Sequence, residues 1–285
     1  MKQLKHTLIM TLLCGLSLVS LGFYREGASE IETLLKTARA SEVKAQGKTG
    51  VTHVIQSYEE VLKKDPTKYV ALCKVGNYKS LLGAAYSPKK REKKKLYLEA
   101  GASLVKAMRT NPAFEAEIEQ GKSVAEAARV LTIREIDAMG YWFTVNFYYY
   151  KECLGVIGKV RNVELIEDCN KMIDHVELLD STWSGGGVYF SKAIYYIAMP
   201  EKFGGSKSEA KRLFEKALSI APDMICNRWG RAKYLYALTG EEDKYRQDLE
   251  WVIESTETDN GDNYLPPAWN AHFRAEAKKM LAEID

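Results

Sequence analysis

Histidine is scarce in this sequence, and the residue patterns that mark catalytic sites are missing from it. Only four histidines occur among 285 residues, and His53, His175 and His272 lie far apart. There is no Gly-x-Ser-x-Gly elbow, no His-x-x-Glu-His motif and no glycine-rich nucleotide loop. We therefore predict that the protein is not an enzyme and holds no metal or cofactor.

An excess of charge of one sign is also missing. Lysine and arginine total 41 against 38 aspartate and glutamate residues, a net charge of +3. This balance does not indicate a nucleic-acid partner. The one basic cluster spans 89–95 and is interrupted by Glu92. We interpret it as the solvated start of a helix, and a site for an anionic partner is the alternative.

No pair of cysteines has the spacing of a metal site or a redox motif. Most of those beyond the N-terminal segment fall in apolar helical stripes, so we expect buried free thiols. An oxidising compartment would permit disulfides, and their pairing is left open by the spacing. The residues concerned are Cys73, Cys153, Cys169 and Cys226.

The longest apolar run lies at the N-terminus. Lys2 and Lys5 precede apolar residues 8–22, which is the arrangement of a secretory signal peptide. We predict a signal peptide over 1–22 and export to the periplasm, with an uncleaved membrane anchor as the alternative. Lipidation is disfavoured because Leu13, just before Cys14, stands where a lipoprotein signal has Gly, Ala or Ser.

The most informative feature present is a spaced pattern that occurs three times. Positions four and three residues apart lie on one face of a helix, and a proline five residues later ends that helix. This combination is typical of the second helix of a tetratricopeptide (TPR) unit, and ordinary amphipathic helices that end in proline are the alternative. The copies are Val54, Tyr58, Val61, Pro66, then Ala100, Leu104, Ala107, Pro112, then Ala210, Phe214, Ala217, Pro222.

Helical periodicity continues through the rest of the chain. After Pro66, Leu72 and Gly76 match the apolar and glycine positions of a TPR first helix. No alternating run typical of a β-strand occurs. We predict an all-α fold, an irregular TPR-like helical-repeat solenoid of antiparallel helix pairs, formed by residues 23–285 as a single domain. A final helix over 268–283 is expected to cap the solenoid.

Aromatic residues are concentrated between the second and third copies of the pattern. Seven occur from Tyr141 to Tyr150, in a helix that Thr132 and Glu135 open with the spacing of a capping box. Seven rings cannot all face one core, so some should line a groove, an interface or a cavity. Core packing is the alternative for any single ring. The predicted ligand- or partner-binding residues are Tyr141, Trp142, Asn146, Tyr149 and Tyr189.

Two glycine-rich segments precede predicted helices. The glycines at 185–187 permit a sharp turn or a close approach of the backbone, and no Lys-Ser/Thr follows to complete a phosphate cradle. Gly204 and Gly205 are predicted to form a structural turn. Ser206 and Glu209 come next with the spacing of a second capping box.

Together these segments resemble the TatT family, the TPR-containing T components associated with TRAP (tripartite ATP-independent periplasmic) transporters. The resemblance rests on Tyr141-Trp142 and on the turn at 204–206, which leads directly into the helix of Ala210, Phe214 and Ala217. It implies a periplasmic solenoid, association with the substrate-binding P component, a homo-oligomer such as a trimer, and a cavity or pore for an apolar ligand. Family members are often lipoproteins, and this chain departs from them at Cys14.

The sequence thus predicts a periplasmic TPR accessory protein of a TRAP-type transport system. It would bind the substrate-binding protein and, as the resemblance implies, a small apolar organic ligand. A general TPR adaptor for protein–protein contacts in the cell envelope is the alternative function. Structural roles are assigned to Gly204, Gly205, Ala210, Phe214, Ala217 and Pro222.

Overall fold

Helices form all the regular structure that is described. The computed structural model describes residues 29–255 and 265–284, and no strand occurs in those two ranges. The predicted signal peptide over 1–22 lies outside them. A helix over 29–43 comes first. It is followed by α2 (Gly47–Lys64), α3 (Tyr69–Tyr86), α4 (Lys90–Met108), α5 (Pro112–Glu119), α6 (Val124–Ala127), α7 (Ile136–Tyr148), α8 (Val156–Arg161) and α9 (Val163–Leu179).

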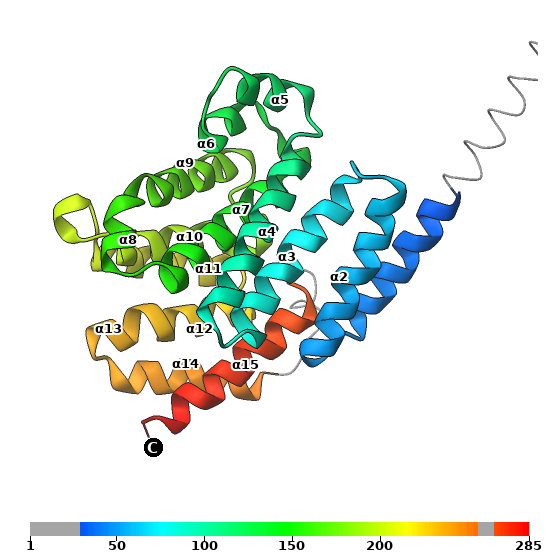
Figure 1. Cartoon of the computed structure of the whole chain (residues 1–285). Helices are drawn as coiled ribbons and strands as arrows, with labels where there is room; N and C mark the ends of the chain where they lie inside the picture. Colours follow the sequence, from blue (N-terminus) through cyan, green and yellow to red (C-terminus); the bar gives the residue numbers. More distant parts are fainter. Residues whose placement is uncertain (1–28, 256–264, 285) are drawn as a thin grey trace, which may run out of the picture.

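The second half of the chain is also helical, as Figure 1 shows. They are α10 (Trp183–Ala198), α11 (Lys207–Ile220), α12 (Ile225–Gly230), α13 (Ala237–Thr239), α14 (Glu242–Glu254) and α15 (Pro267–Ala282). Short 3-10 turns occupy Ala128–Val130, Ile133–Glu135 and Glu201–Phe203. The predicted all-α class is confirmed.

The three copies of the repeated pattern form the most deeply buried faces of α2, α4 and α11. Their apolar residues are Val54, Tyr58, Val61, Ala100, Leu104, Ala107, Ala210, Phe214 and Ala217, and each is 0% exposed. Pro66 and Pro222 lie just after the ends of α2 and α11. Pro112 instead opens α5 as its first residue, a position where its missing N–H leaves no helical hydrogen bond unmade.

Glycine lets the paired helices of this coil approach closely. A Cβ added to Gly76 on α3 would lie 2.6 Å from Cγ of Leu104 on α4. A real Cβ atom does not come so near to another carbon, so the packing of Leu104 against α3 requires glycine at position 76. The TPR-like glycine of the first helix therefore has a steric reason in this chain.

The coil closes through its last helix, which lies beside α12 and α14 and returns toward α3 (Figure 1). The indole Nε1 of Trp269 on α15 donates to Oδ1 of Asn77 on α3 at 2.6 Å, across 192 residues of sequence. Both residues are buried. Beyond capping the solenoid, α15 thus also links the C-terminal end of the coil to α3, near its start.

Local signals at helix ends are only partly reproduced. The Thr132–Glu135 capping box is present in both directions. Ser206 caps α11 by accepting from the Glu209 backbone N–H at 3.2 Å, but the Glu209 carboxylate turns to Arg212 instead of closing the box. The reason is that the Ser206 N–H already donates to the Tyr196 carbonyl.

Two stretches of the described chain wind as π-helix. They are Tyr149–Cys153, which continues α7, and Arg231–Tyr236, which continues α12. Such wide turns occur often at functional sites, and both adjoin the cavity described below.

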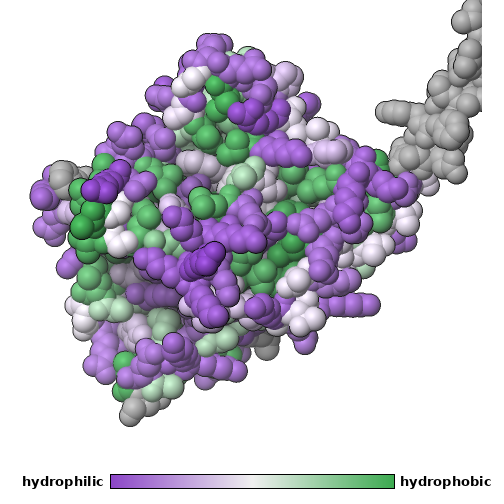
Figure 2. Space-filling view, viewed as in Figure 1, coloured by the Kyte–Doolittle hydropathy of each residue, from purple (hydrophilic) through white to green (hydrophobic). Residues whose placement is uncertain are grey.

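The face of the molecule seen in Figure 2 is mainly polar, and the cysteines of the described chain lie in the interior. Figure 2 shows a mainly hydrophilic face with smaller hydrophobic areas between. No helix in the described ranges is long and apolar enough to cross a membrane. The four cysteines Cys73, Cys153, Cys169 and Cys226 are buried free thiols, as predicted.

Candidate functional site

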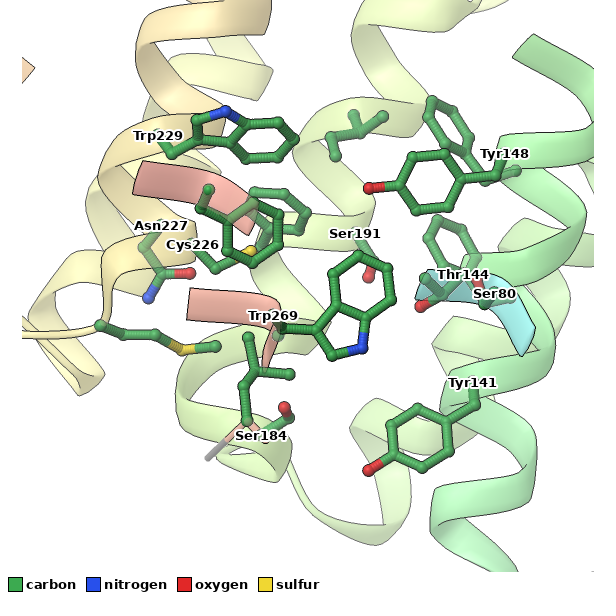
Figure 3. Close-up of a pocket in the computed structure, with 18 of the residues that line it drawn as sticks. Ser80, Tyr141, Thr144, Tyr148, Ser184, Ser191, Cys226, Asn227, Trp229 and Trp269 are labelled. Atoms are coloured by element: carbon green, nitrogen blue, oxygen red, sulfur yellow. The ribbon is translucent and has the colours of Figure 1, made fainter. Parts of the chain in front are cut away.

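An aromatic cavity lies where α3, α7, α10, α12 and α15 meet (Figure 3). The space inside it that is open to the centres of water-sized molecules is about 90 Å³. About half of the residues that line it are aromatic, and the rest are mostly small or aliphatic. Concave apolar sites with a few polar groups are the usual binding sites for small molecules.

One face of α7 supplies the first wall of the cavity. Tyr141, Thr144 and Tyr148 are spaced by three and four residues and so share this face. Phe143 and Phe147 form the neighbouring stripe, with stacked rings whose centroids lie 6.0 Å apart. Of the predicted binding residues, Tyr141 is the one that lines the cavity.

The other predicted binding residues do not line it. Trp142 is buried against neighbouring helices, and the Asn146 amide donates to its carbonyl at 2.8 Å. Tyr149 belongs to the π-helical turn after α7 and is half-buried. Tyr189 is buried on α10, on a side that faces away from the lining residues Phe190 and Ser191. The structure therefore does not gather these four residues around Tyr141.

Three tryptophans that were not among the predicted site residues also line the cavity. Trp183, Trp229 and Trp269 come from α10, α12 and α15. Phe273 lies one turn after Trp269, and its ring centroid is 4.4 Å from that of Trp229. The spacing of Trp269 and Phe273 is a sequence signal for a buried aromatic face on α15, but their partners lie too far away in sequence to be inferred from it.

Glycines fix the positions of two lining rings. A Cβ on Gly140 would lie 2.1 Å from the ring of Trp183, and one on Gly230 would lie 2.0 Å from the ring of Phe190. The Trp183 indole also donates from Nε1 to Oδ1 of Asp137 at 2.9 Å. These rings therefore rest directly on the backbone of neighbouring helices, which keeps the cavity wall rigid.

The glycine-rich segment at 185–187 forms a sharp left-handed turn at the start of α10. Ser184, Gly185 and Gly186 have φ values of 51°, 59° and 81°. A Cβ on Gly186 would lie 2.8 Å from the carbonyl oxygen of Ala217, so this contact requires glycine. The side-chain amide of Asn227 donates to the carbonyls of Gly185 and Ala217 at 3.0 and 3.3 Å. The turn is thereby tied to α11 and α12 at the wall of the cavity.

The cavity is electrically neutral over the part of the chain that the structure describes. None of its described lining residues is Asp, Glu, Lys or Arg. The ammonium of Lys151 stands behind the wall and donates to the Tyr234 hydroxyl at 2.8 Å. Burial lowers the pKa of Lys151 to about 8. Across both described ranges, no cluster of three or more His, Cys, Asp or Glu residues could hold a metal ion.

Comparison with known proteins first identifies the class of fold. The crystal structure of TTC0263, a thermophilic TPR protein in Thermus thermophilus, superposes with a TM-score of 0.55 and 13% identity. The match covers 88% of this chain and 99% of that one. At this identity the likeness concerns the fold alone, and it confirms the predicted TPR-like helical repeat. A search among curated proteins finds no match.

The family is identified by a second comparison. The model of the TRAP transporter T-component family matches residues 79–285, which include every lining residue of the cavity except Asn77. The chain belongs to this family, as the resemblance of its motifs predicted. Membership supports an accessory role in a TRAP transport system, which is not an enzymatic role.

Proposed function

We propose that this chain is exported to the periplasm and serves a TRAP-type transport system there. In this role it binds the substrate-binding protein of the system and holds a small apolar ligand in the aromatic cavity. We further propose that residues 23–285 fold as one domain and that the protein forms a homo-oligomer such as a trimer. Family membership over residues 79–285 supports the role in transport.

The cavity is the observation that carries ligand binding. Protein interiors are normally packed as densely as organic crystals, with few voids larger than a water molecule. An aromatic cavity whose rings rest on glycines at Gly140 and Gly230 departs from this rule without collapsing. A void of this kind is retained at a cost in packing energy, and a ligand would restore the lost contacts.

The partner proposal is tested by direct binding between purified proteins. The mature chain is immobilised, and the substrate-binding protein of the same TRAP system is passed over it in a surface-binding assay. Saturable binding of that protein, without binding of a substrate-binding protein from an unrelated transporter, is the expected result. No binding to the cognate protein, together with binding to several unrelated envelope proteins, would favour the general TPR adaptor.

Native mass spectrometry of the purified mature chain tests the proposed oligomer and the bound ligand. We expect an oligomer and a bound small molecule released on activation. A monomer would contradict the proposed oligomer without affecting the transport role.

A further inference from the structure

Three side chains that line the cavity carry polar atoms without a hydrogen-bond partner. They are Oγ of Ser80, Oδ1 of Asn227 and Nε1 of Trp229. The three residues are only 3%, 0% and 1% exposed. Buried polar atoms are nearly always paired in folded proteins, because an unpaired one loses its water without compensation. Oγ of Ser80 and Oδ1 of Asn227 are polar groups that a ligand would complete, whereas Figure 3 draws the Trp229 nitrogen on the edge of its ring that faces away from the other labelled residues.

The orientation of Asn227 defines which kind of group is missing. Its amide nitrogen donates to the carbonyls of Gly185 and Ala217. Since both neighbours are acceptors, the amide cannot be turned around, and the free atom is the oxygen. Figure 3 shows Asn227 and Ser80 on opposite sides of the cavity, with the Trp269 ring between them. A ligand in this space meets an unpaired acceptor and a hydroxyl across an aromatic surface.

The charge of the walls restricts the ligand further. A charged group buried without a partner costs far more than a neutral polar group. The described lining residues offer no ionised partner, and Lys151 is turned to the hydroxyl and the ring of Tyr234. Lys151, behind this wall, is itself largely buried, and this burial lowers its pKa to about 8. An organic anion in the cavity would therefore lack a counter-charge in contact with it.

We propose that the cavity binds an uncharged, ring-containing molecule that carries a hydroxyl or N–H group and donates it to Oδ1 of Asn227. The ring lies among Tyr148, Trp229 and Trp269, and Ser80 offers a second polar contact on the opposite side. This inference rests on the proposed function, because it assumes that the cavity is a ligand site, and it deepens that function by naming the class of ligand.

Three matched probes test the ligand class by isothermal titration calorimetry with the mature chain at pH 7. The probe 4-methylphenol is neutral and donates a hydrogen bond, 4-methylanisole is neutral and cannot donate, and 4-methylbenzoate is an anion. We expect 4-methylphenol to bind roughly tenfold or more tightly than 4-methylanisole, since an unmade hydrogen bond to a buried group leaves Asn227 unpaired. We expect 4-methylbenzoate to bind most weakly.

The binding place is checked without any substitution that might disturb folding. Labelled tryptophan gives one indole N–H signal for each of the five tryptophans, and 4-methylphenol should shift those of Trp229 and Trp269. The signal of Trp251, which lies on α14 and does not line the cavity, serves as the control. Shifts at Trp251 alone would place the probe elsewhere and overturn the proposal.

The other outcomes separate this inference from the proposed function. Equal affinity for 4-methylphenol and 4-methylanisole would keep the cavity as an apolar ligand site but overturn the requirement for a donor. Tightest binding of 4-methylbenzoate, lost in Lys151→Met, would overturn the requirement for a neutral ligand. If none of the three binds, both the ligand class and the ligand site are wrong, whereas the partner assay still decides the role in transport.

Discussion

Replacing Gly140 by alanine should displace the ring of Trp183 and weaken the cavity wall. The added Cβ would lie 2.1, 2.4 and 2.5 Å from three carbons of that ring, whereas carbon atoms in contact normally lie about 3.5–4.0 Å apart. The ring has little freedom to retreat. Its Nε1 is bound to Oδ1 of Asp137, and the Tyr141 ring lies against it with a centroid distance of 5.8 Å.

The expected magnitude is the balance of two destabilising effects and one stabilising effect. Overpacking of a dense core costs about 1–3 kcal/mol, and loss of the indole hydrogen bond to the Asp137 carboxylate adds about 1.5–3 kcal/mol if the ring swings away. Alanine in the interior of a helix is itself more favourable than glycine by about 1 kcal/mol. We therefore expect Gly140→Ala to lower the free energy of unfolding by roughly 1.5–5 kcal/mol if the ring swings away, and by at most about 2 kcal/mol if its hydrogen bond survives.

Urea unfolding followed by circular dichroism measures this change, and Gly101→Ala is its matched control. Gly101 also lies in a helix interior, on α4, but the nearest atom to its added Cβ is 3.8 Å away, an ordinary contact. This control should gain up to about 1 kcal/mol from helix propensity. If Gly140→Ala is as stable as Gly101→Ala, there is room for a methyl group between α7 and the ring of Trp183, and the argument for a rigid cavity fails.

Further predictions concern the closure of the coil, the buried lysine and the thiols. Trp269→Phe leaves Oδ1 of Asn77 unpaired and should cost roughly 1–3 kcal/mol in urea unfolding; a cost no greater than that of Trp251→Phe would contradict the closure. Burial lowers the folded pKa of Lys151 from 10.5 to about 8, so between these values the unfolded chain binds the extra proton and stability should rise with pH. Lys151→Met should remove this rise, and an unchanged pH profile would refute it. Burial raises the pKa of the thiols of Cys73, Cys153, Cys169 and Cys226, so a thiol reagent should react slowly with the folded mature chain. Once the protein is unfolded without reductant, the reagent should modify all four thiols. Modification of fewer than four would reveal a disulfide.

Much of the fold could be predicted from short-range patterns, because helices are built from neighbours in sequence. The spacing of Val54, Tyr58 and Val61 on α2 placed them on one face, and all three are fully buried. Thr132 capped its turn as predicted, since both partners of the box lie within three residues. Ser206 shows the limit of such patterns, because its backbone N–H had a competitor at Tyr196 in a different helix.

The candidate site was far less predictable. The aromatic run from Tyr141 to Tyr150 was found, but each step along a helix turns a side chain by about 100°, so only some of its rings face the cavity. Which ones do so depends on the helices packed against α7, and these arrive from distant parts of the chain.

Local spacing was therefore enough to predict the main helices and their buried faces, and the resemblance of the motifs pointed to the family. The cavity, by contrast, exists only once the helices have packed. Packing brings Trp183, Trp229 and Trp269 together and closes the coil by a hydrogen bond across 192 residues. The physical reason is that a helix face records only that it will be buried, whereas the identity of its partner is set by how the whole chain packs.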